Sequence, residues 1–310
     1  MRELTIADRR IADETDAYVV AEIGANHMGS VETAKDLFRA AAQCGVDAVK
    51  LQKRDLPTWE ALDPAAWRAP YHSENAFGAT YGEHRAVLEL GWDEYRHLQT
   101  CAHSLGLAFF ATAFDPPSLA FLLDLGVPAV KLASASIVNE PLLEAVAAAG
   151  LPVIASTGGA TMAEIDRAMD LLDGQPPAGY SARNSAGVAL LQCTATYPCQ
   201  PADLNLRVIG LLRSEYPWVV IGLSDHQDGI AMAPVAYALG ARVFEKHFTL
   251  DRAWKGSDQA FSLEPEGMRR LVRDLQRTRL ALGDGEKRRL DAEVPALVKM
   301  GRRDLVEVPA

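Results

Sequence analysis

The sequence alternates eight times between a short apolar run and a longer segment whose apolar residues have helical spacing. The apolar runs, which are typical of parallel strands buried on both faces, occupy 17–23, 46–52, 107–112, 128–133, 151–156, 187–193, 218–223 and 242–247. The helical patterns occupy 30–44, 92–105, 116–125, 139–149, 161–173, 203–215, 228–240 and 264–282. Eight strand–helix units in series predict an α/β fold, a closed (β/α)8 TIM barrel.

Glycines mark the ends of several predicted helices, in the left-handed position where a missing Cβ costs nothing. They are Gly45, Gly106, Gly126, Gly150 and Gly240. An open doubly wound sheet is the alternative, but it normally carries GxGxxG after its first strand. The first turn reads IGANHMG instead, which favours the barrel.

The predicted organisation is a single domain. An N-terminal extension covers 1–16, the barrel covers 17–282, and a short tail without clear periodicity covers 283–310. A long connection, 53–91, follows the second predicted strand. Connections of that length are more often functional than idle, and this one would lie on the carboxyl-terminal rim of the barrel.

Composition narrows the class of protein. With 41 acidic and 31 basic residues, the chain has a net charge of −10, which disfavours nucleic acid as a partner. No stretch approaches the length of an apolar membrane span, and the N-terminus lacks the apolar core of a secretion signal. The four cysteines form no CxxC pair. We therefore expect a cytoplasmic enzyme with no membrane partner.

Polar residues gather where the predicted strands end, which is where TIM barrels place their chemistry. They include Glu22, Lys50, Gln52, Thr112, Lys131, Ser134, Ser156, Tyr197, Ser224, His226, Glu245 and His247. Each alone has a structural explanation, such as an ion-paired lysine, a hydrogen-bonded histidine or a helix-capping serine. Together they are costly to bury unless they pair or bind something.

These residue types make chemical sense as a group. His226 and His247, from adjacent predicted strands, suit a divalent ion such as Mn, Zn or Fe. Glu22 and Glu245 are candidates for proton transfer or for binding sugar hydroxyls. A phosphorylated anion could be clamped by Lys50, Lys131, Ser134 and Ser156 together with loop N–H groups. A phosphate clamp beside a metal suggests bond making or breaking at a carbonyl.

The motifs AEIGANHMGS, VKLQK, VKLASASIVNEPLLE, LLQCTATYP, IGLSDH and ALGARVFEKHFTLD, in this order, resemble the sialic acid synthase family, the N-acetylneuraminate synthases and their relatives. The resemblance covers roughly residues 17–290. It implies a (β/α)8 catalytic barrel that condenses phosphoenolpyruvate with the open-chain aldehyde of an N-acylated amino sugar. The implied products are phosphate and a nine-carbon 2-keto sugar acid. The resemblance also implies a homodimer.

The resemblance assigns roles to individual positions. His226 and His247 match metal ligands, for Mn²⁺ first, with Mg²⁺, Co²⁺ or Zn²⁺ as alternatives. Phosphoenolpyruvate would be held by Lys50, Thr112, Lys131, Ser134, Ser156 and Ser224, and the two lysines would stabilise its charge during catalysis. The sugar or the metal-bound water would face Glu22, Gln52, Tyr197, Glu245 and Asp258. Either Glu22 or Glu245 would move the water proton, and the sequence does not separate them.

The chain departs from the family pattern at four places. It stops near where an antifreeze-like domain, which supplies an Arg to the N-acyl group, would begin. We therefore expect that domain to be absent, by truncation or by nature. Arg302 or Arg303 could substitute for its Arg, although nothing in the spacing requires this. Ala195 replaces a usual Asn, Ser257-Asp258-Gln259 replaces Pro-Asp-His, and Ala111–Asp115 replaces an STPFD-type motif.

The first three departures lie on the acceptor side, so we expect retained donor chemistry and an acceptor other than N-acetylmannosamine. Acceptor choice is expected to depend on the 71–84 segment, where Asn75, Tyr81 and His84 could touch the sugar or only pack the loop.

Two other functions remain open from the sequence. One is a Schiff-base aldolase on the same barrel, with Lys131 or Lys246 as the nucleophile. The other is a non-catalytic descendant that binds a sugar or phosphate and regulates a partner. The first needs no histidine pair, and the second has no need to keep the lysines and histidines together.

Overall fold

Eight parallel strands close into a barrel in the computed structural model, which describes residues 2–173 and 187–305. The neighbours around the barrel are β10, β3, β4, β5, β6, β7, β8 and β9, with β9 returning to β10. The strands are β3 (Tyr18–Gly24), β4 (Ala48–Lys53), β5 (Ala108–Ala113), β6 (Val130–Leu132), β7 (Val153–Ser156), β8 (Val188–Cys193), β9 (Val220–Asp225) and β10 (Val243–His247). All eight predicted strands are confirmed.

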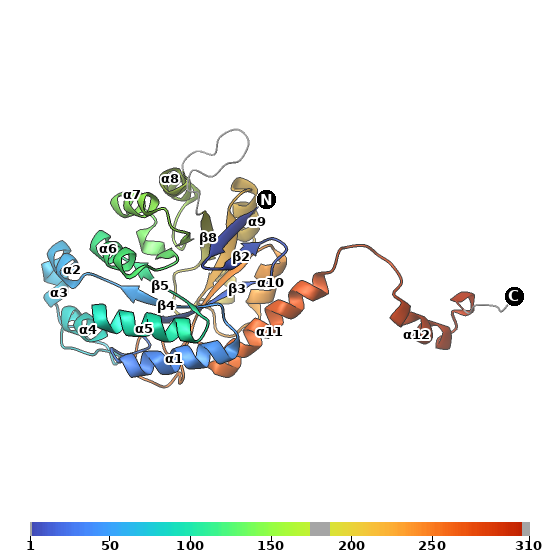
Figure 1. The fold of residues 1–310 in the computed structure, drawn as a ribbon, viewed down its shortest axis with the longest axis horizontal. Helices are drawn as coiled ribbons and strands as arrows, with labels where there is room; N and C mark the ends of the chain where they lie inside the picture. The colour runs from blue at the N-terminus through green and yellow to red at the C-terminus, as the bar shows by residue number, and fades with distance from the viewer. Residues whose placement is uncertain (1, 174–186, 306–310) are drawn as a thin grey trace.

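Helices cover the outside of the barrel (Figure 1). They are α1 (Val31–Cys44), α5 (Trp92–Ser104), α6 (Pro116–Leu125), α7 (Glu140–Ala149), α8 (Met162–Leu172), α9 (Val208–Glu215), α10 (Met232–Ala238) and α11 (Pro265–Leu282). Gly45, Gly126 and Gly150 end their helices with φ of 81°, 76° and 65°, as the sequence predicted. The predicted TIM barrel is therefore confirmed.

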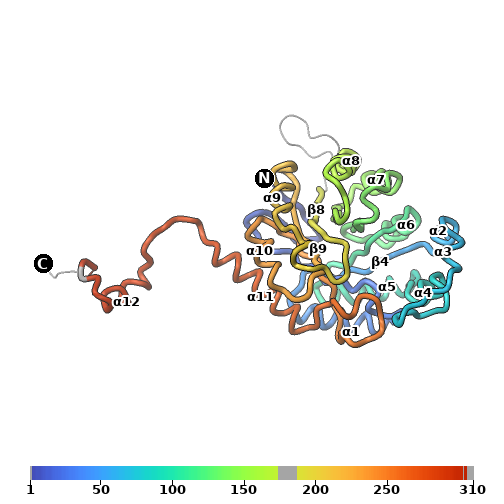
Figure 2. Tube along the Cα trace, turned by 180° about the vertical axis from the view of Figure 1, so that it is seen from behind, coloured from blue at the N-terminus to red at the C-terminus, as the bar shows by residue number. Residues whose placement is uncertain are grey.

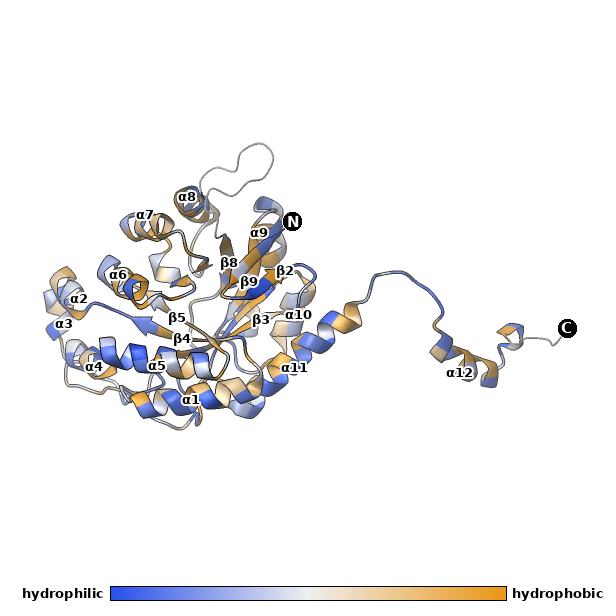
Figure 3. Ribbon diagram, viewed as in Figure 1, coloured by the Kyte–Doolittle hydropathy of each residue, from blue (hydrophilic) through white to orange (hydrophobic). Residues whose placement is uncertain are grey.

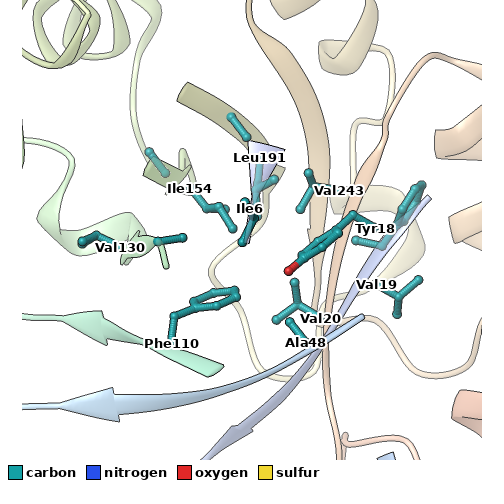
Figure 4. Packing of buried hydrophobic residues seen from close by; sticks show 14 of the residues in the cluster. Ile6, Tyr18, Val19, Val20, Ala48, Phe110, Val130, Ile154, Leu191 and Val243 are labelled. Atoms are coloured by element: carbon teal, nitrogen blue, oxygen red, sulfur yellow. The ribbon is translucent and has the colours of Figure 1, made fainter. Parts of the chain in front are cut away.

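An antiparallel hairpin, β1 (Glu3–Ile6) and β2 (Arg9–Ala12), occupies most of the segment predicted as an N-terminal extension. On β1, Leu4 and Ile6 are buried and alternate with exposed residues, and on β2 the last two residues, Ile11 and Ala12, are buried. In Figure 4 Ile6 lies among barrel residues that include Ile154 and Leu191. The hairpin therefore packs its apolar face into the barrel core.

Replacing Ile6 with alanine is expected to lower the free energy of unfolding by about 2–5 kcal/mol, because it leaves a cavity among packed side chains. Thr5→Ala is the matched control, since Thr5 lies on the exposed face of the same strand. Urea denaturation of the three proteins measures the difference. A loss below about 1 kcal/mol for Ile6→Ala would show that the hairpin is dispensable to the core.

The 53–91 insertion forms three short helices, α2 (Leu56–Leu62), α3 (Pro64–Arg68) and α4 (Tyr81–Leu88). A capping box of Thr80 and Glu83 begins α4. The insertion also touches the loop after β10, because the Gly256 backbone N–H donates to Asn75 Oδ1 at 3.1 Å. It therefore supports the loop that carries the predicted site residue Asp258.

The segment after α11 leads away from the barrel (Figures 1 and 2). It contains the short helix α12 (Val294–Lys299), which is mostly apolar and lies in a tail that mixes hydrophilic and hydrophobic residues (Figure 3). Single 3-10 turns complete the fold: η1 (Ser134–Ser136), η2 (Pro201–Asp203), η3 (Asp291–Glu293) and η4 (Arg303–Leu305). Within the described ranges, no helix has the length and apolar character needed to cross a membrane.

Candidate active site

A cavity of about 380 Å³ opens at the carboxyl ends of the barrel strands. The structure brings most of the predicted site residues together in its lining: Glu22, Lys50, Gln52, Thr112, Lys131, Ser134, Ser156, Tyr197, Ser224, His226, Glu245, His247 and Asp258. They converge because alternate residues of each strand point into the barrel. Three candidates from the 71–84 segment, Asn75, Tyr81 and His84, do not line the cavity.

Lys50 lies at the centre of one polar group. Its Nζ is 2.7 Å from Glu22 Oε2, and it donates to Thr112 Oγ1 at 2.6 Å. Glu22 and Lys50 are partners in the register of β3 and β4, which is why the two side chains meet. Gln52 Nε2 donates to the other Glu22 oxygen at 2.8 Å. Glu22 and Lys50 are both 2 % exposed or less, so this is a buried ion pair.

Lys131 lies at the centre of a second group. Its Nζ donates to Ser156 Oγ at 2.7 Å. The backbone N–H of Gly158 donates to Ser134 Oγ at 3.0 Å, and a Cβ on Gly158 would lie only 2.8 Å from that oxygen. The glycine is therefore required for this close approach. An ammonium group, two hydroxyls and a loop N–H together make a set of donors suited to an anion.

Glu245 faces both lysines. Its carboxylate oxygens lie 3.8 Å from the Nζ atoms of Lys50 and Lys131, and Ser224 Oγ donates to Oε1 at 3.2 Å. Burial alone would raise the pKa of Glu245, but the two ammonium groups reverse this and hold its pKa below the ordinary value. Burial raises the pKa of Glu22 to about 7, against the opposing effect of Lys50. The two acids thus differ electrostatically, a difference that the sequence could not show.

His226 and His247 lie with their ring centroids 5.4 Å apart. His226 Nδ1 is 3.1 Å from the Thr194 carbonyl, and donation there would leave Nε2 with a free lone pair. His247 Nδ1 is buried without a hydrogen-bond partner among the described residues and lies 3.7 Å from Asp258 Oδ2. Burial lowers the pKa of both histidines, that of His226 to about 4, so both are neutral at pH 7.

Neutral imidazoles are the form that binds metal, so this pair fits a divalent ion. Asp258 is the nearest additional oxygen donor. Across residues 2–173 and 187–305, no three or more His, Cys, Asp or Glu side chains form a ready-made metal cluster. An ion on this pair would therefore keep positions for other ligands.

The insertion residues Asn75, Tyr81 and His84 support the rim. Besides the contact of Asn75 with Gly256, the Tyr81 hydroxyl accepts a hydrogen bond from Arg85 Nε at 3.0 Å. His84 Nδ1 accepts from the backbone N–H of Phe77 at 3.1 Å. These contacts are of the loop-packing kind that the sequence left open.

Lys246, one candidate for a Schiff-base nucleophile, lies outside the cavity lining. Its Nζ is 2.8 Å from Asp225 Oδ2 and donates to the Gln227 carbonyl. Asp225 and Lys246 are register partners on β9 and β10, and each directly precedes one of the two histidines that line the cavity. This buried ion pair joins the two strands, whereas Lys131 faces the cavity.

The residues at which the chain departs from the family pattern lie in two different places, the cavity wall and the packing of the rim. Ala195 lines the cavity, and so do Ser257 and Asp258. Gln259 is fully buried, with Oε1 accepting from Thr249 Oγ1 and Nε2 donating to the Asn26 carbonyl at 3.2 Å. Gln259 thus belongs to the packing of the rim and not to the cavity wall.

Two charged residues of the cavity wall, Arg54 and Arg85, were not predicted from the sequence. Arg54 directly follows β4, two residues beyond Gln52, and Arg85 lies on α4. The position of Arg54 next to a predicted strand end was a usable signal. No comparable signal marked Arg85 in the sequence, because its place in the cavity wall depends on how the insertion folds.

The NeuB family model matches residues 37–287 of the chain. The chain is 38 % identical to the N-acetylneuraminate-9-phosphate synthase of Mus musculus, over 97 % of this chain and 82 % of that protein. It is 38 % identical to the N,N'-diacetyllegionaminic acid synthase of Legionella pneumophila, over 94 % and 81 %. The crystal structure of the N-acetylneuraminic acid (sialic acid) synthetase of Leptospira borgpetersenii, in complex with citrate, superimposes with a TM-score of 0.80 at 31 % identity and 98 % coverage of both chains. The resemblance to the sialic acid synthases is confirmed, and the chain is an enzyme that belongs to the NeuB family.

Proposed function

We propose that this enzyme condenses phosphoenolpyruvate with the open-chain aldehyde of a sugar, giving a 2-keto sugar acid and phosphate. The observation that carries the proposal is one cavity holding both an anion cradle and a pair of neutral imidazoles. The relatives named above make acids of this class, which supports the same reaction here.

Phosphoenolpyruvate would be held by Lys50, Thr112, Lys131, Ser134, Ser156 and Ser224. Lys131 and the Ser134 region would bind one anionic group through the ammonium, hydroxyl and backbone N–H donors. Lys50, fixed by Glu22 and Thr112, would supply a second positive charge. Because the lysines are buried and already positioned, their charge stabilises the transition state without reorganisation.

His226 and His247 would hold a divalent ion, Mn²⁺ or a related metal, that polarises the aldehyde oxygen when bound. C3 of phosphoenolpyruvate then forms the new bond to the aldehyde carbon, and the aldehyde oxygen gains a proton. Water adds to C2, and the C–O bond to phosphate breaks. Atoms balance, since phosphoenolpyruvate, aldehyde and water give the 2-keto acid and phosphate.

Glu22 is the residue we propose for the water proton. Its pKa near 7 lets it accept and release a proton at neutral pH, whereas the lysines keep Glu245 ionised. Gln52 orients the Glu22 carboxylate. Tyr197, beside His226 with ring centroids 4.4 Å apart, and Asp258 would face the sugar.

The acceptor would be an N-acylated amino sugar or a related aldose. The relatives' names include one product with a phosphate and one without, so they leave that feature of the acceptor open. We further propose a homodimer in the cytoplasm, whose subunit consists of the 17–282 barrel and its flanking segments.

The test is phosphate release from phosphoenolpyruvate with Mn²⁺ over a panel of free and phosphorylated aldoses. Release is expected only with an acceptor, to stop with EDTA, and to return with added Mn²⁺. His247→Ala is expected to lower kcat/KM at least about a hundredfold, because it removes half of the imidazole pair. Failure of phosphoenolpyruvate to bind would contradict the donor assignment.

The same preparations test the two other functions. Borohydride trapping of a 2-keto acid on Lys131 would indicate a Schiff-base aldolase instead. Binding of a sugar and phosphoenolpyruvate with no turnover of any acceptor would indicate the non-catalytic descendant.

A further inference from the structure

The cavity wall contains two arginines, Arg54 and Arg85, that belong neither to the donor cradle nor to the imidazole pair. The cavity's lysines have carboxylate partners, since Lys50 pairs with Glu22 and Lys131 approaches Glu245. Neither arginine has a carboxylate oxygen within 4.0 Å in the part of the chain that the structure describes. Among the described residues, the two positive charges in the wall therefore lack an ion-pair partner, and the acids that act on Arg54, Glu89 and Asp258, do so from beyond that distance.

Arg54 is 8 % exposed. Its guanidinium carbon lies 3.5 Å from the centroid of the Phe114 ring, and Nη1 donates to Gln52 Oε1 at 3.1 Å. Nε is buried and has no hydrogen-bond partner among residues 2–173 and 187–305. A buried charge with an unused donor is costly unless a ligand supplies the missing anion.

Arg85 is held in place from the insertion. Its Nε donates to the Tyr81 hydroxyl, and the Tyr81 ring packs edge-on against Trp67 and Tyr71 at 5.9 and 5.6 Å. The two guanidinium groups are close enough to repel each other: after burial, the charge of Arg85 is the next cause that lowers the pKa of Arg54, to about 10. Arg54 therefore remains charged at neutral pH, and a doubly negative ligand would relieve the repulsion between the two groups.

Hydrogen bonds connect Arg54 to the acceptor side of the cavity. Arg54 donates to Gln52, and Gln52 donates to Glu22, which lies beside the proposed reacting centre. The donor cradle of Lys131, Ser134 and Ser156 comes instead from β6, η1 and β7, on another part of the wall. An acceptor with its aldehyde near Glu22 would extend its far end along Gln52 toward the arginines.

We propose that Arg54 and Arg85 form a second anion subsite, which binds a phosphate group on the acceptor sugar at the end remote from the aldehyde. Guanidinium forks match phosphate oxygens through paired N–H donors, whereas an uncharged hydroxymethyl group needs no such charge. The inference rests on the proposed synthase function and narrows its acceptor to aldose phosphates.

The test compares N-acetylmannosamine with N-acetylmannosamine 6-phosphate, which differ only in the phosphate, by following phosphoenolpyruvate consumption. The wild-type kcat/KM is expected to be at least about tenfold higher for the phosphorylated sugar, and Arg85→Gln is expected to lower this preference about 10- to 100-fold. Arg85→Lys should restore part of it, because the charge returns without the fork. Arg68→Gln, on an exposed arginine of the same insertion, should leave the preference unchanged.

Equal wild-type kcat/KM values for the two sugars, or an equal loss on both in Arg85→Gln, would overturn the subsite and leave the synthase intact. If neither sugar is turned over, the comparison is made with whichever aldose of the panel is active and with its phosphate. If no aldose of the panel is active, the proposed function is contradicted, and calorimetric titration of the two sugars tests the subsite separately. The subsite is supported if only the phosphorylated sugar binds and if this binding is lost in Arg85→Gln. The subsite is overturned if the phosphorylated sugar does not bind, or if its binding is unchanged by the substitution. Arg54→Lys provides a second variant that keeps the buried charge and removes the fork.

Discussion

Lys50→Met is expected to abolish turnover, lowering kcat/KM by at least about a thousandfold, and to destabilise the protein by about 3–5 kcal/mol. The ammonium of Lys50 lies 2.7 Å from Glu22 and 3.8 Å from Glu245, and all three side chains are buried. Removing it leaves acidic groups without their nearest positive partner. It also removes one of the two lysines proposed to hold phosphoenolpyruvate.

A double variant separates stability from chemistry. Lys50→Met combined with Glu22→Gln removes both members of the ion pair, so it should recover part of the lost unfolding free energy but none of the activity. Denaturant unfolding and steady-state kinetics on the same samples measure both quantities. Activity that returns with stability would mean that Lys50 is structural and that another group binds the donor.

Glu22→Gln is expected to lower kcat/KM about 100- to 10,000-fold and to change its pH dependence. Because burial raises the pKa of Glu22 to about 7 and the ionised form accepts the water proton, wild-type kcat/KM should fall as pH drops below about 7. Above that pH the carboxylate is already ionised and the profile should level off. The glutamine side chain cannot ionise, so the kcat/KM of Glu22→Gln should not show this fall at low pH.

The comparison uses kcat/KM measured from pH 5.5 to 9 for the wild type, Glu22→Gln and Glu32→Gln. This range extends roughly one and a half units below and two units above the pKa of Glu22. Glu32 is an exposed acid of α1, so its variant should retain the wild-type profile. An unchanged limb near pH 7 in Glu22→Gln would assign that ionisation to another group and would remove the reason for choosing Glu22 over Glu245.

The barrel was predictable because its periodicity is local. Each buried strand reads as an apolar run, and each helix start and stop is set by neighbouring residues, such as the Asp115 cap of α6 and the glycine that ends it. The β1–β2 hairpin was missed because its strands have only four residues each, and their burial depends on the far end of the barrel. The same applies to the helices of the insertion, whose aromatic packing joins residues from separate segments.

The candidate site, like the fold, was predictable only in part. Strand-end positions predicted that lysines, serines, acids and histidines would meet at one rim, because parallel strands in a barrel deliver their carboxyl ends to one place. Asn75 and Tyr81 were candidates from their segment alone, and their side chains instead support the rim.

Residue type and spacing along the chain were therefore enough to predict the barrel, the set of polar residues on its rim and the family resemblance. Tertiary structure alone decided that Glu22 and Glu245 differ in pKa, that Lys246 pairs with Asp225 outside the cavity, and that Arg54 and Arg85 share a wall without an acidic partner within ion-pair distance among the described residues. The physical reason is that burial and charge–charge interactions depend on distances between atoms from different strands and loops. Those distances exist only once the chain has folded.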